Sequence, residues 1–315
     1  MRWQDMRRSE NVDDITDGQP AGGGVSFGGG GLKLGGGAMI LVVIVSLLFG
    51  VNPLQFLGMM DGSGPPPAPV PAPASGPQVA PPGYGPQIAP RPGGPQTSRP
   101  TGDRDTELSA HVLGDTEEVW TALFQAMGTG KYVPPRLELF RGSVTSMCGQ
   151  ASASAGPFYC PADRKLYLDT SFFQELHNRF GAPGDFAQAY VIAHEVGHHV
   201  QNQLGTMRKF DQMSSGLDDR RRKALSVRLE LQADCYAGVW GFFAARRNLL
   251  DPGDAEEALK AAAAVGDDTI QKRTRGYVVP DGFTHGTSEQ RMKWFKTGFQ
   301  SGDPMLCDTF SARNP

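Results

Sequence analysis

Residues 189–200 read AYVIAHEVGHHV and contain the pattern HExxH, formed by His194, Glu195 and His198. Residues four apart lie on one face of an α-helix, so both imidazole rings can bind a single metal ion. Glu195 lies beside them and can reach a water molecule at that ion. Burying two histidines and a carboxylate in so apolar a run is costly without a metal or other partners. The stretch therefore predicts a buried helix that carries a zinc site.

The ends of this helix are marked by two residues. Asp185 is a favoured N-cap residue, and Gly205 stands where a helix commonly ends in a left-handed residue. The predicted helix therefore spans 186–204. His199 follows His198 directly, but it is turned by about 100° around the helix axis. We expect His199 to be a polar residue on the flank of the helix rather than a ligand.

A catalytic zinc needs a third protein ligand and an open fourth position. Glu230 and Asp234, in the run ELQAD, are four residues apart on a second predicted helix at 218–248. Glu230 can bind the zinc while Asp234 accepts the second N–H of a ligand histidine. Small neighbours, Ala233, Ala237, Gly238 and Gly241, would let this helix approach the first one closely. The alternative is a solvated acidic pair, and weaker candidates for the ligand are Asp211, Asp218 and Asp219.

Two further residues are candidates for stabilising a transition state. His285 precedes a predicted helix that starts with a capping box at Thr287, and it can donate to a developing oxyanion. A loop histidine, or a part of the helix cap, is an equally good interpretation. Tyr159 is a weaker candidate for the same role. The remaining histidines, His111 and His177, are expected at structural or surface positions.

The first hundred residues differ sharply in composition from the rest. Residues 38–51 carry no charge, and with their neighbours they predict a membrane-spanning helix at 34–57. A cleaved secretory segment is the alternative, but the run starts late and lacks a small-residue cleavage site. Four basic residues precede it and the next one after it is Arg91, so the positive-inside rule predicts a cytoplasmic, Gly-rich tail at 1–33.

Residues 58–102 form a Pro/Gly-rich segment that predicts a disordered, extended linker. The folded domain is then 103–315, on the extracytoplasmic side of the membrane. Lys and Arg do not outnumber Asp and Glu within it, which excludes nucleic-acid binding through bulk electrostatics.

All four cysteines lie in 103–315, in a compartment predicted to be oxidising. Four cysteines allow three pairings. A short Gly/Ser-rich loop separates Cys148 from Cys160, which favours that pair and leaves Cys235 with Cys307. A cysteine metal site is disfavoured because no CxxC spacing occurs.

Periodicity and turn residues predict a fold of class α+β, predominantly α, with a small sheet. Besides the helices above, the pattern favours helices at 109–127 and 254–265 and one that starts at the capping box. Two short alternating runs, 137–140 and 165–168, favour strands.

Five segments together resemble the bacterial neutral zinc metallopeptidase family. They are MRWQDMRRSENVDD (1–14), GPFYCPADRKLYLD (156–169), HEVGHHVQNQLG (194–205), ELQADCYAGVW (230–240) and FTHGTSEQR (283–291). The similarity covers nearly the whole chain except the Pro-rich segment. HExxH with a downstream ExxAD also resembles the wider gluzincin group, in which the second glutamate binds zinc and the aspartate supports a histidine.

The resemblance implies a zincin-like fold in which His194, His198 and Glu230 hold one Zn²⁺ and Asp234 supports a ligand histidine. It also implies an edge strand, somewhere in 144–168, that pairs with an extended peptide. We therefore expect a peptidase of the bacterial inner membrane, with its catalytic domain periplasmic, in which Glu195 is the general base and peptides or proteins are the substrates. A non-proteolytic, zinc-containing peptide-binding or scaffold protein of the envelope is the alternative.

Overall fold

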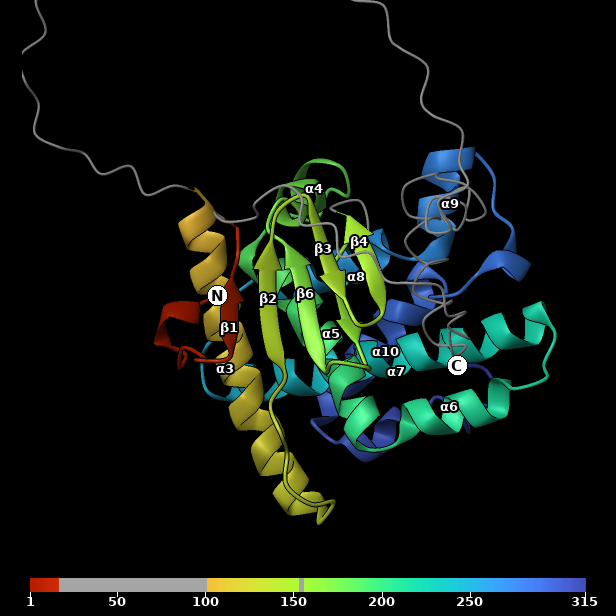
Figure 1. Cartoon of the computed structure of the whole chain (residues 1–315), viewed down its shortest axis with the longest axis horizontal. Helices are drawn as coiled ribbons and strands as arrows, with labels where there is room; N and C mark the ends of the chain where they lie inside the picture. The colour runs from red at the N-terminus through yellow and green to blue at the C-terminus, as the bar shows by residue number, and fades with distance from the viewer. Residues whose placement is uncertain (17–100, 153–155) are drawn as a thin grey trace, which may run out of the picture.

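The computed structural model describes residues 1–16, 101–152 and 156–315 (Figure 1). The fold in this part of the chain is α+β and predominantly helical, as the periodicity predicted. The helices are α3 (Thr101–Met127), α4 (Phe172–Asn178), α5 (Asp185–Gln203), α6 (Thr206–Ser214), α7 (Asp219–Arg246), α8 (Asp254–Ala264), α9 (Asp267–Arg275) and α10 (Ser288–Ser301), with short 3₁₀ turns η1 (Trp3–Asp5), η3 (Pro280–Gly282) and η4 (Pro304–Cys307).

Several predicted helix ends are confirmed. Gly205 follows α5 with φ of 79°, and Asp218 caps α7 by accepting a hydrogen bond from the backbone N–H of Arg221. Thr287 and Gln290 form the capping box of α10. The start of α5 differs from the prediction, because Gly184 is its N-cap and Asp185 is already helical.

Four strands form the main sheet, in the order β1 (Val12–Asp14), β2 (Arg136–Phe140), β6 (Lys165–Asp169) and β5 (Phe158–Cys160). The β1–β2 and β2–β6 pairs are parallel, and β5 is antiparallel to β6. A separate hairpin joins β3 (Ser143–Ser146) to β4 (Gly149–Ser152). The strands predicted at 137–140 and 165–168 are thus β2 and β6, the central pair.

The side-chain alternation of β2 and β6 divides the core in two. Their leucines, such as Leu139 and Leu166, belong to the large cluster that includes the apolar residues of α3, α5 and α7. Phe140 and Tyr167 point the other way, into a smaller cluster closed by Val144 of β3. A strand presents successive side chains to opposite faces, so a five-residue strand contributes to both clusters.

Small residues bring the central helices together. A Cβ placed on Gly197 of α5 would lie 2.9 Å from the carbonyl oxygen of Ala233 in α7, so the two backbones nearly touch. Gly238, which was also expected to face α5, instead packs against α10, where a Cβ would lie 2.1 Å from the carbonyl oxygen of Phe295. α7 therefore lies in close contact with a helix on each side, and Figure 1 shows the strands passing in front of α5.

The predicted boundary at the N-terminus is wrong. Residues 1–16 are not part of a separate tail, because β1 pairs in register with Leu137, Glu138 and Leu139 of β2. Trp3 is buried in the large cluster, and Glu117 of α3 accepts hydrogen bonds from Arg7, Ser9 and Asn11. The glycine-rich composition that suggested a tail begins only after residue 17. The first strand and the domain fold as one unit.

The predicted span, 34–57, and nearly all of the predicted linker, 58–102, lie outside the described residues. Among the helices of the described part, none has the length and apolar character that a membrane crossing requires. A single crossing by 34–57 would place β1 and β2 on opposite sides of a membrane, which is incompatible with their pairing within one chain.

Both predicted disulfides are present. Cys148 is bonded to Cys160 and closes the β3–β4 hairpin against β5. Cys235 of α7 is bonded to Cys307 of η4 and ties the C-terminal segment to the helix that carries Glu230 and Asp234.

Candidate metal centre

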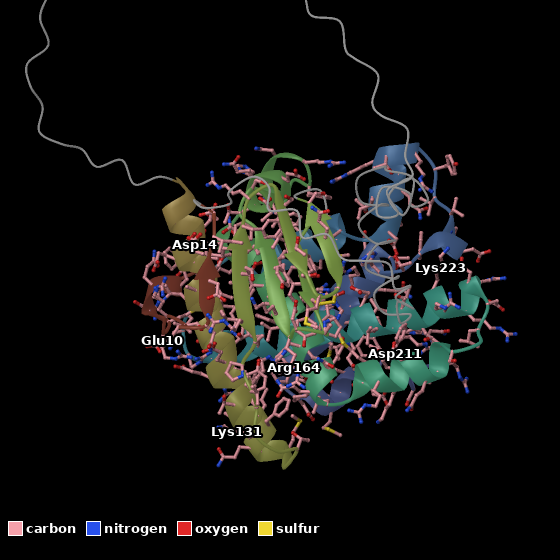
Figure 2. All side chains as sticks on the ribbon, viewed as in Figure 1. Glu10, Asp14, Lys131, Arg164, Asp211 and Lys223 are labelled. Carbon is pink, nitrogen blue, oxygen red and sulfur yellow. A yellow bond between two sulfur atoms is a disulfide. The ribbon has the colours of Figure 1, made fainter. Side chains whose placement is uncertain are left out.

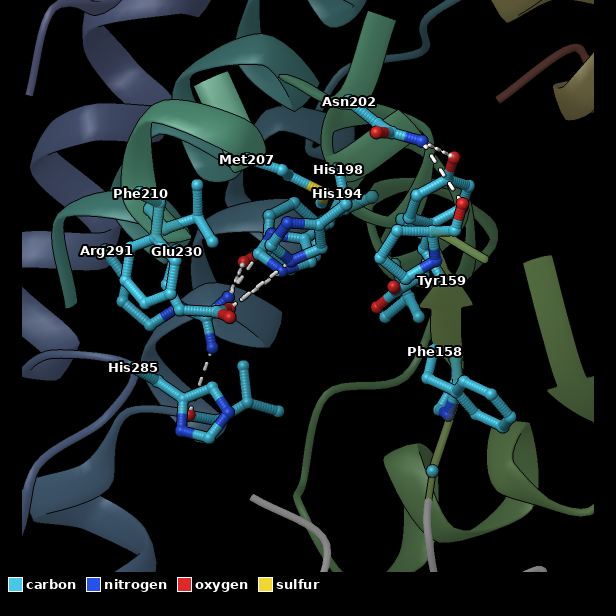
Figure 3. Close-up of a pocket in the computed structure, with 18 of the residues that line it drawn as sticks. Phe158, Tyr159, His194, His198, Asn202, Met207, Phe210, Glu230, His285 and Arg291 are labelled. Atoms are coloured by element: carbon cyan, nitrogen blue, oxygen red, sulfur yellow. Dashed lines mark hydrogen bonds and ion pairs between the residues drawn. The ribbon is translucent and has the colours of Figure 1, made fainter. Parts of the chain in front are cut away.

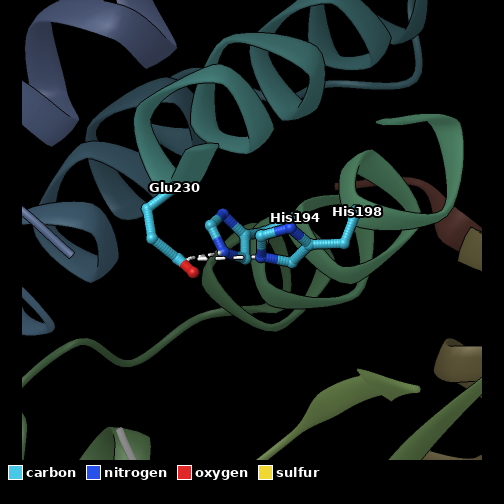
Figure 4. A group of neighbouring side chains, drawn as sticks. All are labelled: His194, His198 and Glu230. Atoms are coloured by element: carbon cyan, nitrogen blue, oxygen red, sulfur yellow. Dashed lines mark hydrogen bonds and ion pairs between the residues drawn. The ribbon is translucent and has the colours of Figure 1, made fainter. Parts of the chain in front are cut away.

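His194, His198 and Glu230 converge on one point between α5 and α7. The Nε2 atoms of His194 and His198 lie 3.3 and 3.6 Å from Oε2 of Glu230, and the three ligand atoms are all within 4.8 Å of one another. Figure 4 shows both rings pointing at the same carboxylate. A helical spacing of four on α5 and the close approach of α7 at Gly197 together produce this arrangement.

A buried network of charged side chains contacts His194 at Nδ1, the ring nitrogen that does not face Glu230. The Nδ1–H of His194 donates to Oδ1 of Asp234 at 2.9 Å, and the hydroxyl of Tyr190 donates to the same oxygen at 2.5 Å. Arg291 of α10 donates hydrogen bonds to both carboxylate oxygens of Asp234, from Nε to Oδ2 and from Nη2 to Oδ1, each at 2.8 Å. Asp234 is completely buried and Arg291 nearly so. The ring of His194 is thereby fixed with Nε2 toward Glu230.

The charges of this network support one another. Burial alone would raise the pKa of Asp234, but Arg291 and His194 hold it at about 2. Burial alone would lower the pKa of His194, but Asp234 and Glu230 raise it to about 9. Arg291 thus keeps Asp234 ionised, and Asp234 in turn holds the proton on Nδ1 of His194, so that Nε2 is the nitrogen that would bind a metal.

His198 is held in an equivalent way by Gln201. The Nδ1–H of His198 donates to Oε1 of Gln201 at 2.9 Å, which leaves Nε2 free to face Glu230. The amide nitrogen of Gln201 donates to the carbonyl oxygen of Leu229 at 2.7 Å and to Oε1 of Gln232 at 3.1 Å. Both candidate ligand histidines therefore have their second nitrogen fixed by α5 or α7.

Glu195 and His285 complete the site. Both line one cavity of about 390 Å³ together with the three candidate ligands. Burial raises the pKa of Glu195 above its usual value, which makes its carboxylate a stronger base. Oδ1 of Asp267 lies 3.1 Å from Nδ1 of His285, and Oδ2 of Asp267 accepts three backbone N–H groups, from residues 284, 285 and 286.

The environment of His285 favours a protonated ring. Burial alone would lower the pKa of His285, but the charge of Asp267 raises it above its usual value. The same carboxylate fixes the loop backbone, so the ring is held rigidly at the edge of the cavity below Glu230, as Figure 3 shows. His285 is positioned to donate a hydrogen bond into the cavity.

Tyr159 was the weaker candidate for this donor role, and its hydroxyl is occupied elsewhere. The hydroxyl lies 3.1 Å from Nδ1 of His199 and accepts from the side-chain amide of Asn202 at 2.8 Å. His199 is buried, and burial lowers its pKa to about 4, so it is a neutral acceptor that fastens β5 to α5. His199 is therefore a buried structural residue on the flank of α5, outside the group of candidate ligands.

The other predicted candidates lie away from the ligand cluster. Asp218 caps α7, Asp219 pairs with Lys223, and Asp211 is exposed at the rim of the cavity on α6. Figure 2 shows where Asp211 lies on α6 and Lys223 on α7. Nδ1 of His111 lies 2.7 Å from the carbonyl oxygen of Met6, and His177 is exposed on α4, in agreement with the structural and surface positions expected for them.

Sequence reasoning missed Arg291, Asp267, Tyr190 and Gln201. Arg291 had a detectable signal, because it occupies the same helical face as the buried Phe295, and an arginine on a buried face needs a buried anion. Asp267 had no such signal, because no sequence pattern connects it to the loop that contains His285, eighteen positions later.

Comparison with known proteins agrees with this geometry. The family described as "Putative neutral zinc metallopeptidase" matches residues 1–310. The chain belongs to this family. It is 43% identical over 312 residues to the uncharacterized protein YpfJ of Escherichia coli strain K12, covering 98% of this chain and 99% of that protein. It is 47% identical over 207 residues to the uncharacterized protein Mb2605 of Mycobacterium bovis, covering 62% and 67%. No solved structure matches the chain.

The donor set of this family member fits zinc. Tetrahedral zinc with bonds of about 2.0–2.1 Å separates its ligand atoms by roughly 3.3 Å, and the two histidine–carboxylate separations here are 3.3 and 3.6 Å. Two histidines and one carboxylate leave a fourth position for water or substrate, which is the arrangement of catalytic rather than structural sites.

Proposed function

We propose that this zinc metallopeptidase family member hydrolyses peptide bonds with Glu195 as its general base. The observation that carries the proposal is the position of Glu195 in the same cavity as the three candidate ligands. A metal kept only for structural reasons would be closed by a fourth protein ligand and would need no base beside it. When bound, zinc supplies a Lewis acid that acidifies water and polarises the scissile carbonyl group.

The protein's own residues divide the remaining work. Glu195 accepts a proton from the attacking water and later gives it to the leaving amine, a transfer that its raised pKa favours. His285 is oriented by Asp267, whose charge raises its pKa, and it donates a hydrogen bond to the oxyanion that forms on the substrate carbonyl.

Strand β5 is the part of 144–168 that we propose as the peptide-binding edge. It is the last strand of the described sheet, and its residues Phe158 and Tyr159 line the cavity. An extended peptide that adds to a sheet edge is held by main-chain hydrogen bonds, which do not depend on its sequence. A peptide lying along β5 would pass directly over the ligands on α5.

We propose an extracytoplasmic location for the folded domain, including residues 1–16. The two disulfides support it, because such bonds persist in oxidising compartments. Thiol trapping of the protein from intact cells tests the proposal: oxidised cysteines are expected, and four free thiols would contradict it.

The test of the activity is peptide hydrolysis by zinc-loaded full-length protein. We expect Glu195→Gln to retain zinc and to lose about 10²–10⁴-fold in kcat/KM. The matched control is Glu289→Gln, an exposed position on α10, which should retain full activity. A wild-type protein that binds one zinc and peptides but cleaves none of a mixed library would instead support the alternative of a binding protein.

The ligand assignment has its own test, which does not depend on activity. Glu230→Ala is expected to weaken zinc affinity strongly, because it removes one of three protein ligands. His177→Ala, on the exposed face of α4, should leave the affinity unchanged. Equal zinc affinity in wild type and Glu230→Ala would remove Glu230 from the site.

A further inference from the structure

The walls of the cavity, rather than its catalytic groups, indicate a class of substrate. Apolar side chains from several separate elements surround the candidate ligands. They are Phe158 of β5, Phe172 of α4, Phe180 after it, Val191 of α5, Met207 and Phe210 of α6, and Leu229 of α7. The volume of about 390 Å³ falls in the range of sites that enclose a ligand group.

These walls lie on two sides of the histidine pair. Figure 3 shows Phe158 and Tyr159 on one side and Met207 and Phe210 on the other, with His194 and His198 between them. Phe210 is buried although it belongs to a short, largely exposed helix, so its ring is directed inward. Gly205, with its positive φ, makes the turn between α5 and α6, and α6 then runs alongside α7 in Figure 1.

Apart from Glu230 and Glu195, the buried charged groups of the cavity lining are paired with other buried side chains. Arg291 is paired with Asp234, and His285 is paired with Asp267. The charged residues of α6 that line it, Arg208 and Asp211, are exposed at its rim. A charged substrate side chain would therefore lose its hydration in the apolar part of the cavity without meeting an unpaired buried partner, which is costly.

We infer that the site selects peptides with a large apolar side chain, such as Phe or Leu, next to the scissile bond. The inference rests on the proposed peptidase activity and adds the substrate class to it. Removing even one methylene from a group that fills a hydrophobic pocket costs 10–200-fold in kcat/KM. Replacing Phe by Ala beside the cleaved bond should therefore lower kcat/KM at least tenfold, and Asp should be worse than Ala.

The experiment uses a series of quenched-fluorescence peptides that differ only in having Phe, Leu, Ala or Asp at either position flanking a central bond. Zinc-loaded full-length protein is incubated with each peptide to measure kcat/KM, and mass spectrometry locates any bond that is broken. Cleavage at Phe or Leu at least tenfold above Ala supports the inference. Equal kcat/KM for Phe, Ala and Asp overturns it while leaving the peptidase function intact. A protein that cleaves no peptide under any condition overturns both.

A pair of variants on α6 ties the preference to this wall. Met207 lines the cavity and its sulfur lies beside the histidines in Figure 3, whereas Met213 on the same helix is 49% exposed and does not line it. Met207→Lys should raise the Asp-to-Phe ratio of kcat/KM at least tenfold, and Met213→Lys should leave it within twofold. The ratio is independent of how much protein is folded or loaded, so an unchanged ratio in Met207→Lys overturns the assignment of this wall.

Discussion

Arg291→Met is the sharpest test of the network behind the metal site. The substitution retains a long apolar side chain but removes both hydrogen bonds to Asp234, a bond of 3.2 Å to the carbonyl oxygen of Val265, and one of 3.2 Å to the hydroxyl of Tyr190. Asp234 is then left as a fully buried carboxylate without its strongest partner. Breaking a buried pair from one side costs about 3–5 kcal/mol.

A loss of that size is a large share of the roughly 5–15 kcal/mol that stabilises a typical domain. We expect a clearly lower denaturation midpoint for metal-free Arg291→Met, measured by urea unfolding with the disulfides intact. Arg275→Met, at an exposed position at the end of α9, is the matched control and should stay within about 0.5 kcal/mol of wild type.

The double variant Arg291→Met with Asp234→Asn separates the charge from the packing. Removing both charges avoids the unpaired carboxylate, so the double variant should lose less free energy of unfolding than the sum of the single variants. Zinc affinity adds an independent measurement, because loosening the aspartate behind His194 should lower it about 10–100-fold. Arg291→Met with wild-type stability and wild-type zinc affinity would refute the role assigned to this arginine.

Three further predictions concern the pKa of His285, the close contact of α7 with α10, and the removal of zinc. Asp267→Asn removes the charge that raises the pKa of His285, so the alkaline limb of kcat/KM should move to lower pH; an unmoved limb would exclude His285 as the donor. Gly238→Ala should lower the free energy of unfolding by about 1–3 kcal/mol or more, because its Cβ would force α7 away from Phe295. Gly282→Ala, whose Cβ would make only an ordinary 3.5 Å contact with Nε2 of Gln271, should be nearly neutral in urea unfolding. Chelation should lower the thermal midpoint, since zinc at 100 times its Kd adds about 2.7 kcal/mol.

The parts of the fold that could be predicted are those with a local signal. The HExxH spacing, the capping box at Thr287 and the left-handed Gly205 each depend on residues within a few positions of one another. The same holds for the alternation in β2 and β6. The candidate ligand Glu230 also had a local signal, because Asp234 follows it by one helical turn.

What could not be predicted depends on contacts between distant segments. β1 is only three residues long, and its partner β2 lies more than a hundred positions away, so composition alone assigned it to a tail. The pairing of Asp267 with His285 depends on how α9 and the loop before α10 meet. The orientation of Gly238 toward α10 depends on which face of α7 each neighbouring helix takes.

The close packing of three helices explains why the buried charges are tolerated. Each of α5, α7 and α10 contributes one member of the chain that runs from His194 through Asp234 to Arg291. Glycines at the two contacts allow backbone approaches that place these side chains within hydrogen-bonding distance. A wider spacing would leave an ionised carboxylate and a guanidinium group buried apart, each at a high cost in desolvation. The geometry of the metal ligands thus depends on α10, a helix that contributes no ligand itself.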